Sequence, residues 1–212
     1  MSNFRRRLMM ALNKKENFDD FQEVEYIGST GYQYIDTEIK PTNLTKVEIS
    51  FMQSSQTGYL YGSRTSSSSN DAHAFILHYG SIYPQFDGQQ SKVSSSYNKT
   101  GIKYILKNSQ DGAYINDDLT KSYTESSFSS DYSMYLFALN QSNSVESRTL
   151  KGRIYYCKIF EDGILVRRFV PCYRKSNGEI GMYDLVNNVF YTNKGSGTFT
   201  KGSDVVTKWF DY

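Results

Sequence analysis

The chain has 212 residues, 38% of them hydrophobic and 22% charged, with a mean hydropathy of -0.58, which fits one globular domain with short appendages. Its 16% aromatic content and three Pro exclude a disordered or Pro-rich linker. No run approaches the roughly 18 apolar residues of a membrane helix, and the early apolar stretch 8–12 is shorter than the core of a secretory signal, about 7 to 15 residues. We therefore expect no membrane partner and no export by that route.

The positive charge of the chain is concentrated at its start. Of the 24 basic residues, Arg5, Arg6, Arg7, Lys14 and Lys15 lie in the first 15 positions without an acid, so the other 19 basic and 22 acidic residues give the body a net charge of -3. Proteins that bind nucleic acids usually cluster Lys and Arg on the folded body. The charge distribution therefore predicts no nucleic-acid partner.

The first segment, residues 1–22, is predicted to be a basic attachment arm, either a short helix or an extended chain. Its apolar residues recur at i, i+4 and i+8, the spacing of one helix face, beside the three Arg. An isolated helix of this length is marginal in water and needs a partner surface, and the alternative is a frayed tail. The candidate attachment residues are Phe4, Arg5, Arg6, Arg7, Leu8 and Leu12.

From residue 23 the pattern changes to short runs rich in Val, Ile, Tyr, Phe and Thr, separated by Gly, Asn, Asp and Ser. This pattern predicts strands and leaves almost no room for helices. The predicted strands are 24–27, 32–36, 46–52, 59–62, 73–78, 82–86, 102–106, 113–116, 133–139, 153–160, 164–170, 181–184, 189–191 and 198–201.

The predicted strands and turns favour an all-β, mostly antiparallel fold. Turn signals such as Asp162-Gly163 and Asn177-Gly178 suit hairpins, and a sandwich or a barrel is the economical way to bury the sheet faces. The length favours a two-sheet sandwich over residues 23–202. The last segment, 203–212, ends in Trp-Phe-Asp-Tyr, and we expect this aromatic tail to dock on a surface.

Two cysteines flank the predicted hairpin that closes at Asp162-Gly163. A two-residue type I′ turn pairs Cys157 with Arg168 and Cys172 with Arg153, which separates the sulfurs by about 13 Å along the ladder. We expect two free thiols, with intermolecular pairing as the alternative.

Few residues suggest catalysis or metal binding. His73 and His78 are five apart on a predicted strand, so they face opposite sides of the sheet and cannot chelate one ion. No zinc spacing, phosphate-binding Gly loop or nucleophile elbow occurs, and no strand carries a carboxylate pair suited to glycoside hydrolysis. A spatially assembled Ser/His/Asp triad stays open. We predict no enzymatic activity, no cofactor and no metal.

The tyrosines are the strongest candidates for binding. Sugar rings stack their C–H faces on aromatic side chains, while their hydroxyl groups bind Asn, Asp, Gln and backbone groups. Tyr is also common in sandwich frameworks, and we expect most of the tyrosines to serve there. The candidate carbohydrate-binding residues are Tyr59, Tyr61, Tyr79 and Tyr83.

Four segments carry a family resemblance: EYIGSTGYQYIDTEIK at 25–40, GRIYYCKIFEDGILVRRFVPC at 152–172, GMYDLV at 181–186 and GSGTF at 195–199. Together they resemble the concanavalin A-like lectin/glucanase (laminin-G-like) jelly roll of gut bacteria and their tailed phages. The resemblance implies a two-sheet antiparallel jelly roll that often binds carbohydrate. The hydrolases of that superfamily use a Glu-x-Asp-x-x-Glu strand, which is absent, and the ligand pattern of the calcium lectins has no clear counterpart.

A single such domain behind a basic arm resembles a virion decoration protein, such as a head fibre component of a crAss-like phage. The resemblance implies a protein made in the host cytoplasm and carried on the virion, attached to other virion proteins by the arm, with glycans or the host surface as further partners. A homo-oligomer is expected because virion appendages are usually symmetric. The alternatives are an architectural sandwich without a ligand and a divergent glycan hydrolase.

Overall fold

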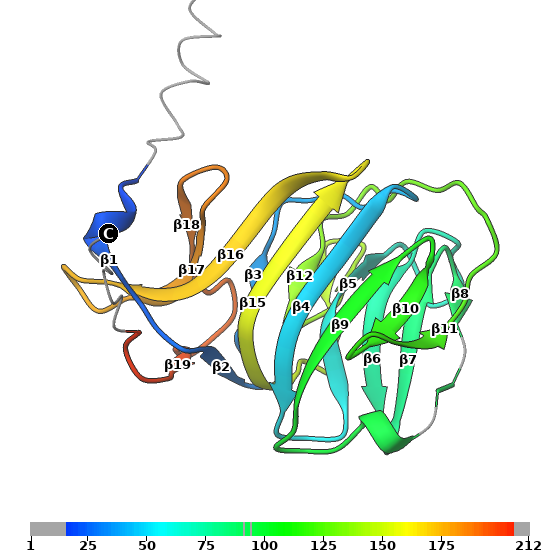
Figure 1. The fold of residues 1–212 in the computed structure, drawn as a ribbon, viewed down its shortest axis with the longest axis horizontal. Coiled ribbons are helices and arrows are strands. Elements are labelled where there is room, and N and C mark those ends of the chain that lie inside the picture. Colours follow the sequence, from blue (N-terminus) through cyan, green and yellow to red (C-terminus); the bar gives the residue numbers. More distant parts are fainter. Residues whose placement is uncertain (1–15, 91, 94, 206–212) are drawn as a thin grey trace, which may run out of the picture.

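The structure is a computed structural model that describes residues 16–90, 92–93 and 95–205. The predicted attachment residues of the arm and the Trp-Phe-Asp-Tyr end of the tail lie outside these residues. Two sheets pack face to face as a sandwich, which confirms the predicted all-β two-sheet fold (Figure 1). The described residues contain no α-helix, and their helical turns are the 3₁₀ elements η1 (Phe18–Asp20) and η2 (Ser95–Tyr97).

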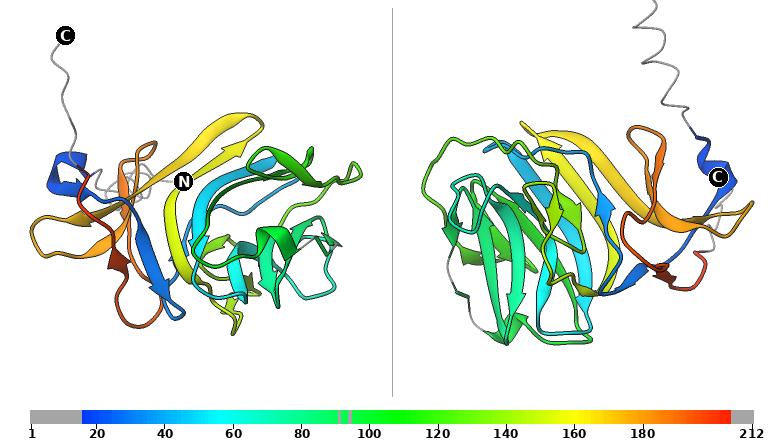
Figure 2. Two further views of the ribbon diagram at one scale, coloured as in Figure 1. Left: turned by 60° about the horizontal axis from the view of Figure 1, so that its bottom comes forward. Right: turned by 180° about the vertical axis from the view of Figure 1, so that it is seen from behind.

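The large sheet has the strand order β11-β10-β9-β4-β15-β16-β17-β18, with β1, β2 and β19 paired beside this path (Figure 2). Its strands are β1 (Phe21–Glu23), β2 (Ile27–Thr30), β4 (Thr45–Gln53), β9 (Lys103–Ser109), β10 (Gly112–Ile115), β11 (Asp118–Lys121), β15 (Lys151–Glu161), β16 (Ile164–Arg174), β17 (Ile180–Asp184), β18 (Val189–Tyr191) and β19 (Thr200–Lys201).

The small sheet has the order β14-β13-β5-β6-β7-β8, with β3 and β12 paired beside it. Its pairs are antiparallel except for β13 with β5, which run parallel. Its strands are β3 (Ile35–Asp36), β5 (Gly58–Arg64), β6 (His73–His78), β7 (Ser81–Phe86), β8 (Gln89–Gln90), β12 (Tyr135–Leu136), β13 (Asn140–Gln141) and β14 (Ser144–Val145).

The main core lies between the two sheets. Alternating residues of β4, such as Val47, Ile49 and Phe51, meet the inward residues Phe75 and Leu77 of β6, and all five are buried. This alternation is the signature of strands with one face on a core.

A buried amide joins the sheets inside this core. Asn108 on β9 donates from Nδ2 to the Tyr61 hydroxyl at 2.8 Å and to the Gln85 carbonyl at 3.2 Å, while the Tyr123 hydroxyl donates to its Oδ1 at 3.0 Å. Burial raises the pKa of Tyr61 and of Tyr123 well above the ordinary tyrosine range, so both hydroxyl groups stay protonated. The amide thus links the large sheet to β5 and β7.

A second, smaller core lies on the other face of β16 and β17, where Phe21, Cys172, Tyr183 and Phe190 pack together. Glu16 closes this cluster: its carboxylate accepts from Arg174 Nη2 at 2.7 Å and from the Phe190 amide at 3.1 Å. Residues 16–22 were assigned from the sequence to the arm, but they pack on the sandwich, because Phe21 buries its ring in this second core.

The hairpin of β15 and β16 closes at Asp162 and Gly163 with positive φ at both, as predicted. The predicted register holds beside the turn and then shifts by one residue at a bulge after Ile159, so that Cys157 faces Phe169 rather than Arg168. Cys172 pairs with Gly181 of β17, not with Arg153. Both thiols are free, as predicted, and they are buried in different cores.

Candidate functional site

A pocket of about 410 Å³ opens on the outer face of the small sheet, the face turned away from the main core. Strands β5, β6, β7 and β8 carry most of its lining, and the segment after β14 completes it. We call it the face pocket; its lining residues are Tyr59, Arg64, Ser67, Ile76, His78, Tyr83, Gln90 and Arg148.

A β-bulge at Leu60 decides which side chains of β5 reach the face pocket. The register of β5 against β6 shifts between Tyr59 and Tyr61, so Leu60 and Tyr61 both belong to the main core while Tyr59 lies on the outer face. Arg64 then follows on the outer face with Tyr59. Two tyrosines at i and i+2, which would share one face of a regular strand, are separated in this way.

Tyr59 forms the floor of the face pocket and is itself only 1% exposed. Two guanidinium groups cover its ring, with the Cζ atoms of Arg64 and Arg148 at 5.9 Å and 5.4 Å from the ring centroid. Its hydroxyl accepts from Arg148 Nη2 at 3.0 Å. Tyr59 therefore orients two cations rather than offering an open face to a sugar.

Backbone pairing holds Arg148 at this position. The amide of Tyr59 donates to the carbonyl of Arg148 at 2.9 Å, and Tyr59 also forms a bridge with Thr149. Arg148 Nη1 lies 3.2 Å from Nδ1 of His78 on β6. Because a guanidinium can only donate, this His78 nitrogen is the acceptor of the contact.

Two aromatic rings lie close to His78: Tyr83 in the lining of the face pocket and Tyr79 beside it. Tyr83 on β7 is partly buried against the outer-face cluster, and its ring lies 6.2 Å from that of His78. Tyr79 stands on the β6–β7 turn at φ 43, is 80% exposed and lies 4.5 Å from the His78 ring. The exposed aromatic surface is therefore supplied by these two residues.

The four tyrosines predicted as sugar contacts thus have three different settings. Tyr59 and Tyr83 line the face pocket, and Tyr79 lies beside it across His78. Tyr61 is 0% exposed in the main core, where its hydroxyl is bound by Asn108, so its ring cannot contact a ligand. The sequence interpretation of Tyr61 was wrong because the bulge at Leu60 is not visible in the alternation of residue types.

The sequence analysis missed the charged residues of the face pocket, Arg64 and Arg148. They are 84 positions apart in the chain and meet only because residues 148–149 lie beside β5. No local motif marks such a pairing. The one sequence signal for Arg64 is that a charged residue ends a strand whose other residues are apolar, small or Tyr.

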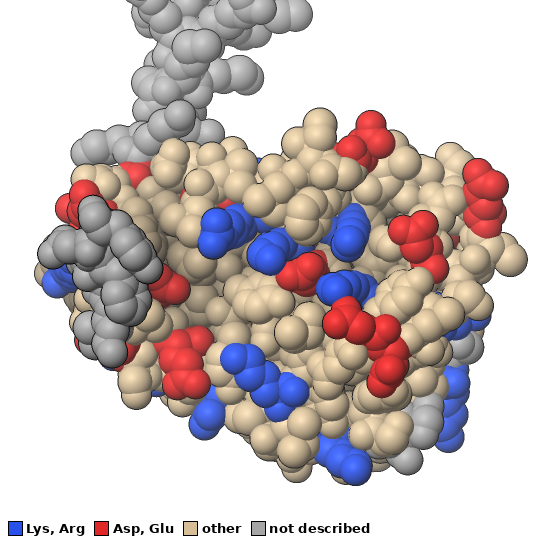
Figure 3. All heavy atoms as spheres, viewed as in Figure 1, with Lys and Arg blue, Asp and Glu red and all other residues tan. Residues whose placement is uncertain are grey.

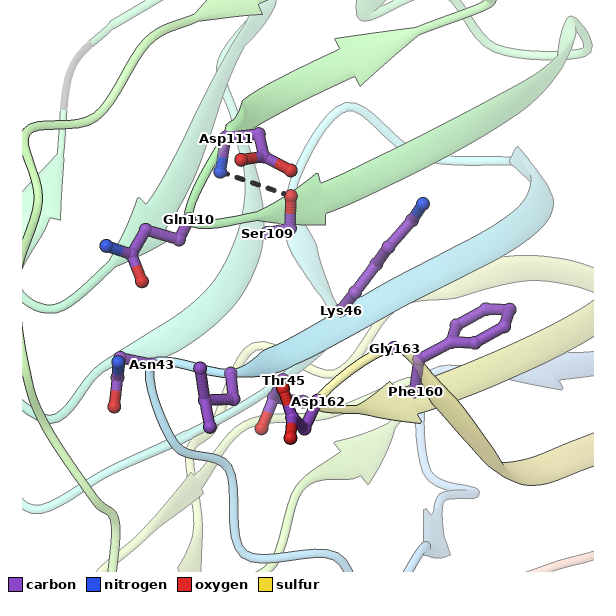
Figure 4. A pocket seen from close by; sticks show the side chains of 10 residues that line it. Asn43, Thr45, Lys46, Ser109, Gln110, Asp111, Phe160, Asp162 and Gly163 are labelled. Atoms are coloured by element: carbon purple, nitrogen blue, oxygen red, sulfur yellow. Dashed lines mark hydrogen bonds between the residues drawn. The ribbon is translucent and has the colours of Figure 1, made fainter.

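A second hollow, of about 490 Å³, lies at the rim of the sandwich between three turns (Figure 4). Figure 4 places Lys46 between the turn of Ser109 to Asp111 and the turn of Asp162 and Gly163. Next to this rim hollow Glu161 accepts from Thr45 and Thr42, and burial raises its pKa. Asp111 and Asp162, which line this hollow, are exposed turn residues.

The outer face of the large sheet is not a cation-only surface. Figure 3 shows Lys and Arg there interspersed with Asp and Glu. Lys158 lies 2.9 Å from Glu48 and Lys107 lies 2.6 Å from Asp117. Strands β4, β9 and β15 still carry six basic and two acidic residues, so cations such as Lys46, Lys103 and Arg153 have no ion pair among the described residues.

The described part of the chain holds no cluster of three or more His, Cys, Asp or Glu side chains suited to a metal ion. His73 is buried between the sheets against Tyr61 and Phe86, whereas His78 lies on the outer face, as their odd spacing predicted. None of the described helical segments is long and apolar enough to cross a membrane.

Comparison with known proteins identifies the fold but no family. No family model matches the sequence, and no curated protein matches it. A solved structure from Bacteroides ovatus ATCC 8483, described as a candidate carbohydrate-binding protein, is similar with a TM-score of 0.55 at 11% identity. The similarity covers 87% of this chain and 62% of that one.

Domains LG4-5 of the mouse laminin α1 chain are also similar, with a TM-score of 0.50 at 13% identity over 86% of this chain and 46% of theirs. This chain therefore spans less than two thirds of either neighbour. The two neighbours and the sheet order define the fold: a two-sheet, mostly antiparallel β-sandwich similar to those of the Bacteroides ovatus protein and the laminin domains.

Proposed function

We propose that this protein is a glycan-binding domain and that the sugar binds in the face pocket. The observation that carries the proposal is the set of side chains in and beside the pocket: Tyr83 in the lining and Tyr79 next to it offer aromatic surface, while Arg64, Arg148 and Gln90 of the lining offer hydrogen-bond donors. Aromatic faces with a few convergent polar groups are what a sugar requires. The similarity to a candidate carbohydrate-binding protein of the same fold adds support.

The proposal is for binding rather than hydrolysis. Glycosidases need two carboxylates about 5 to 10 Å apart across the scissile bond. The lining of the face pocket contains no Asp or Glu among the described residues. A sugar held there would meet cations, amides and aromatic rings, none of which supplies that pair.

A glycan array with the full chain tests the proposal. The expected result is a reproducible hit that weakens at least about fivefold in Tyr83→Ala, since stacking on an aromatic ring contributes on the order of 1 kcal/mol or more. Tyr32→Ala is the matched control, because Tyr32 is 66% exposed and does not line the face pocket. An array without hits from a folded sample would contradict the proposal and favour an architectural sandwich.

We further propose that the domain is a virion decoration component, made in the host cytoplasm and attached to another virion protein through its N-terminal segment. The support is the concentration of basic residues within the first 15 positions and the fixed anchor that follows, where Glu16 is bound to Arg174, Phe190 and the Asn188 carbonyl. A homo-oligomer on the particle fits this role.

Deletion of residues 1–15 tests the attachment. The deletion stops before Glu16 because residues 16–22 belong to the packed body. The shortened protein should fold normally by circular dichroism, bind the same sugar and fail to join particles. Incorporation into particles at the level of the full chain would contradict the attachment proposal and leave glycan binding untouched.

A further inference from the structure

Arg64 carries a charge that nothing in the described structure neutralises. The residue is 7% exposed, and its Nε donates to the neutral amide oxygen of Gln141 at 2.9 Å. No carboxylate among the described residues lies within ion-pair distance of it, and its remaining guanidinium nitrogens have no protein acceptor there. Removing a cation from water is costly unless an anion compensates for it.

A second cation lies over the same ring. Arg148 covers the Tyr59 ring together with Arg64, and its nearest carboxylate is Glu146, 3.7 Å away. The Arg148 side chain is 45% exposed, so its pair with Glu146 is a weak surface contact. The Tyr59 hydroxyl and His78 Nδ1 hold the Arg148 guanidinium in place and supply no negative charge.

Burial distinguishes the Arg64 cation of the face pocket from the other unpaired cations of the described residues. On the large sheet Lys46, Lys103 and Arg153 also have no ion pair among the described residues, but they lie over aromatic rings and are half-buried or exposed, whereas Arg64 is buried. Guanidinium groups are the side chains best suited to the paired oxygens of a carboxylate or sulfate, because their donors form a rigid fork.

We propose that the face pocket selects anionic sugars, meaning sugar units that bear a carboxylate or a sulfate group. This inference rests on the proposed function. Arg64 and Arg148 bind the anionic group, and Tyr83 packs against the sugar ring. Arg64, unpaired and enclosed in the free protein, gains its missing counter-ion only when the ligand is present.

The test measures the affinity of the full chain for matched pairs of sugars by calorimetry at fixed salt. Each pair differs only in the acidic group: galactose with galacturonic acid, glucose with glucuronic acid, and N-acetylglucosamine with its 6-sulfate. The acidic member of at least one pair should bind about tenfold or more tightly, as expected for charge-assisted hydrogen bonds. Comparison of the two uronic acid pairs with the sulfate pair shows whether the pocket prefers a carboxylate or a sulfate group.

Arg64→Gln should remove this preference, and Arg148→Gln should weaken it. Arg153→Gln is the matched control, because Arg153 also lies over a tyrosine, with its Cζ 4.2 Å from the Tyr26 ring centroid, on the other sheet. If Arg64→Gln does not fold, Arg148→Gln carries the test, since that side chain is half-exposed. A circular dichroism spectrum of each variant confirms the fold.

The outcomes separate the two proposals. Equal binding of neutral and acidic sugars, or an acidic preference that survives both pocket variants, overturns the anionic specificity and leaves glycan binding standing. A complete absence of sugar binding by the folded chain overturns both.

Discussion

We expect the loss of the small Asn108 side chain to lower the free energy of unfolding of the sandwich strongly. Asn108→Ala removes the partner of three polar groups at once: the hydroxyls of Tyr61 and Tyr123 and the carbonyl of Gln85. A buried polar group left unpaired costs about 1–3 kcal/mol. Because Tyr123 is partly exposed and can recover water, we expect a total loss of roughly 3–5 kcal/mol in the free energy of unfolding.

The two tyrosines give a graded series around the same amide. Tyr123→Phe leaves Asn108 Oδ1 without its donor and should cost about 1–2 kcal/mol. Tyr61→Phe leaves Asn108 Nδ2 still bound to the Gln85 carbonyl and should cost about 1 kcal/mol or less. The expected order of destabilisation is therefore Asn108→Ala, then Tyr123→Phe, then Tyr61→Phe.

Urea unfolding followed by far-UV circular dichroism measures these differences, with the midpoint compared at a common slope. Asn70→Ala serves as the control, since Asn70 is an exposed turn residue and its change should stay within about 0.5 kcal/mol of the wild type. An Asn108→Ala protein within 1 kcal/mol of the wild type, or a reversed order of the variants, would refute the idea that this amide joins the sheets.

Three further results are expected. Gly62→Ala should destabilise by more than about 3 kcal/mol in the same urea assay, because the new Cβ would lie 2.4 Å from that of Ala74 and 2.8 Å from Leu139 at a φ of 153°; stability at the wild-type level would contradict this close packing. Burial lowers the pKa of His73 from 6.5 to about 4, so the unfolded chain takes up a proton first as pH falls below 6.5. Between pH 6.5 and 5 the free energy of unfolding of the wild type should fall by about 2 kcal/mol more than that of His73→Gln. If the two proteins lose stability in parallel as the pH falls, His73 is not a buried neutral ring. Burial raises the pKa of Cys157 beyond the ordinary thiol range and that of Cys172 to about 12, so neither should react with a thiol reagent at pH 8 until urea unfolds the chain; rapid labelling of the native protein would show otherwise.

Regular strands were predictable because their residue types alternate or cluster over their full length. The segments 73–78 and 189–191 match β6 and β18, and the Asp162-Gly163 turn closes the hairpin as expected. Short pairings with polar residues were missed, among them β13 (Asn140–Gln141) and β14 (Ser144–Val145). These strands exist only because a neighbouring strand supplies hydrogen bonds.

The predicted strand 133–139 shows how a local conformation can override an apolar run. Only Tyr135–Leu136 pairs as a strand, because Phe137 adopts a φ of 67° and turns the chain. Its amide bonds instead to the Leu60 carbonyl at 2.8 Å, with its side chain fully buried. The surrounding packing enforces a backbone conformation that a bulky residue rarely adopts, and residue type alone does not reveal it.

The candidate site was predictable only in part for the same reason. Tyr83 and Tyr79, two of the candidate sugar contacts, lie in the lining of the face pocket and beside it, and their contact with a sugar stays a prediction. Arg64 and Arg148 come close together because residues 148–149 run parallel to β5, far from it in the sequence. Tyr59 and Tyr61 face opposite sides of the sheet because of the bulge at Leu60. Both are tertiary features.

The first and last described residues leave the sandwich at one end, where Gln22 Nε2 donates to the Val205 carbonyl at 3.1 Å and Glu16 is fixed against β17 and β18 (Figure 1). Strands β5 to β7, which carry the face pocket, lie toward the opposite end in both Figure 1 and Figure 2. Molecules tethered side by side through either terminus would thus hold the strands that carry their pockets away from the support. On such a crowded support a sugar polymer could engage several copies at once, and a weak single-site affinity would become firm adhesion through avidity.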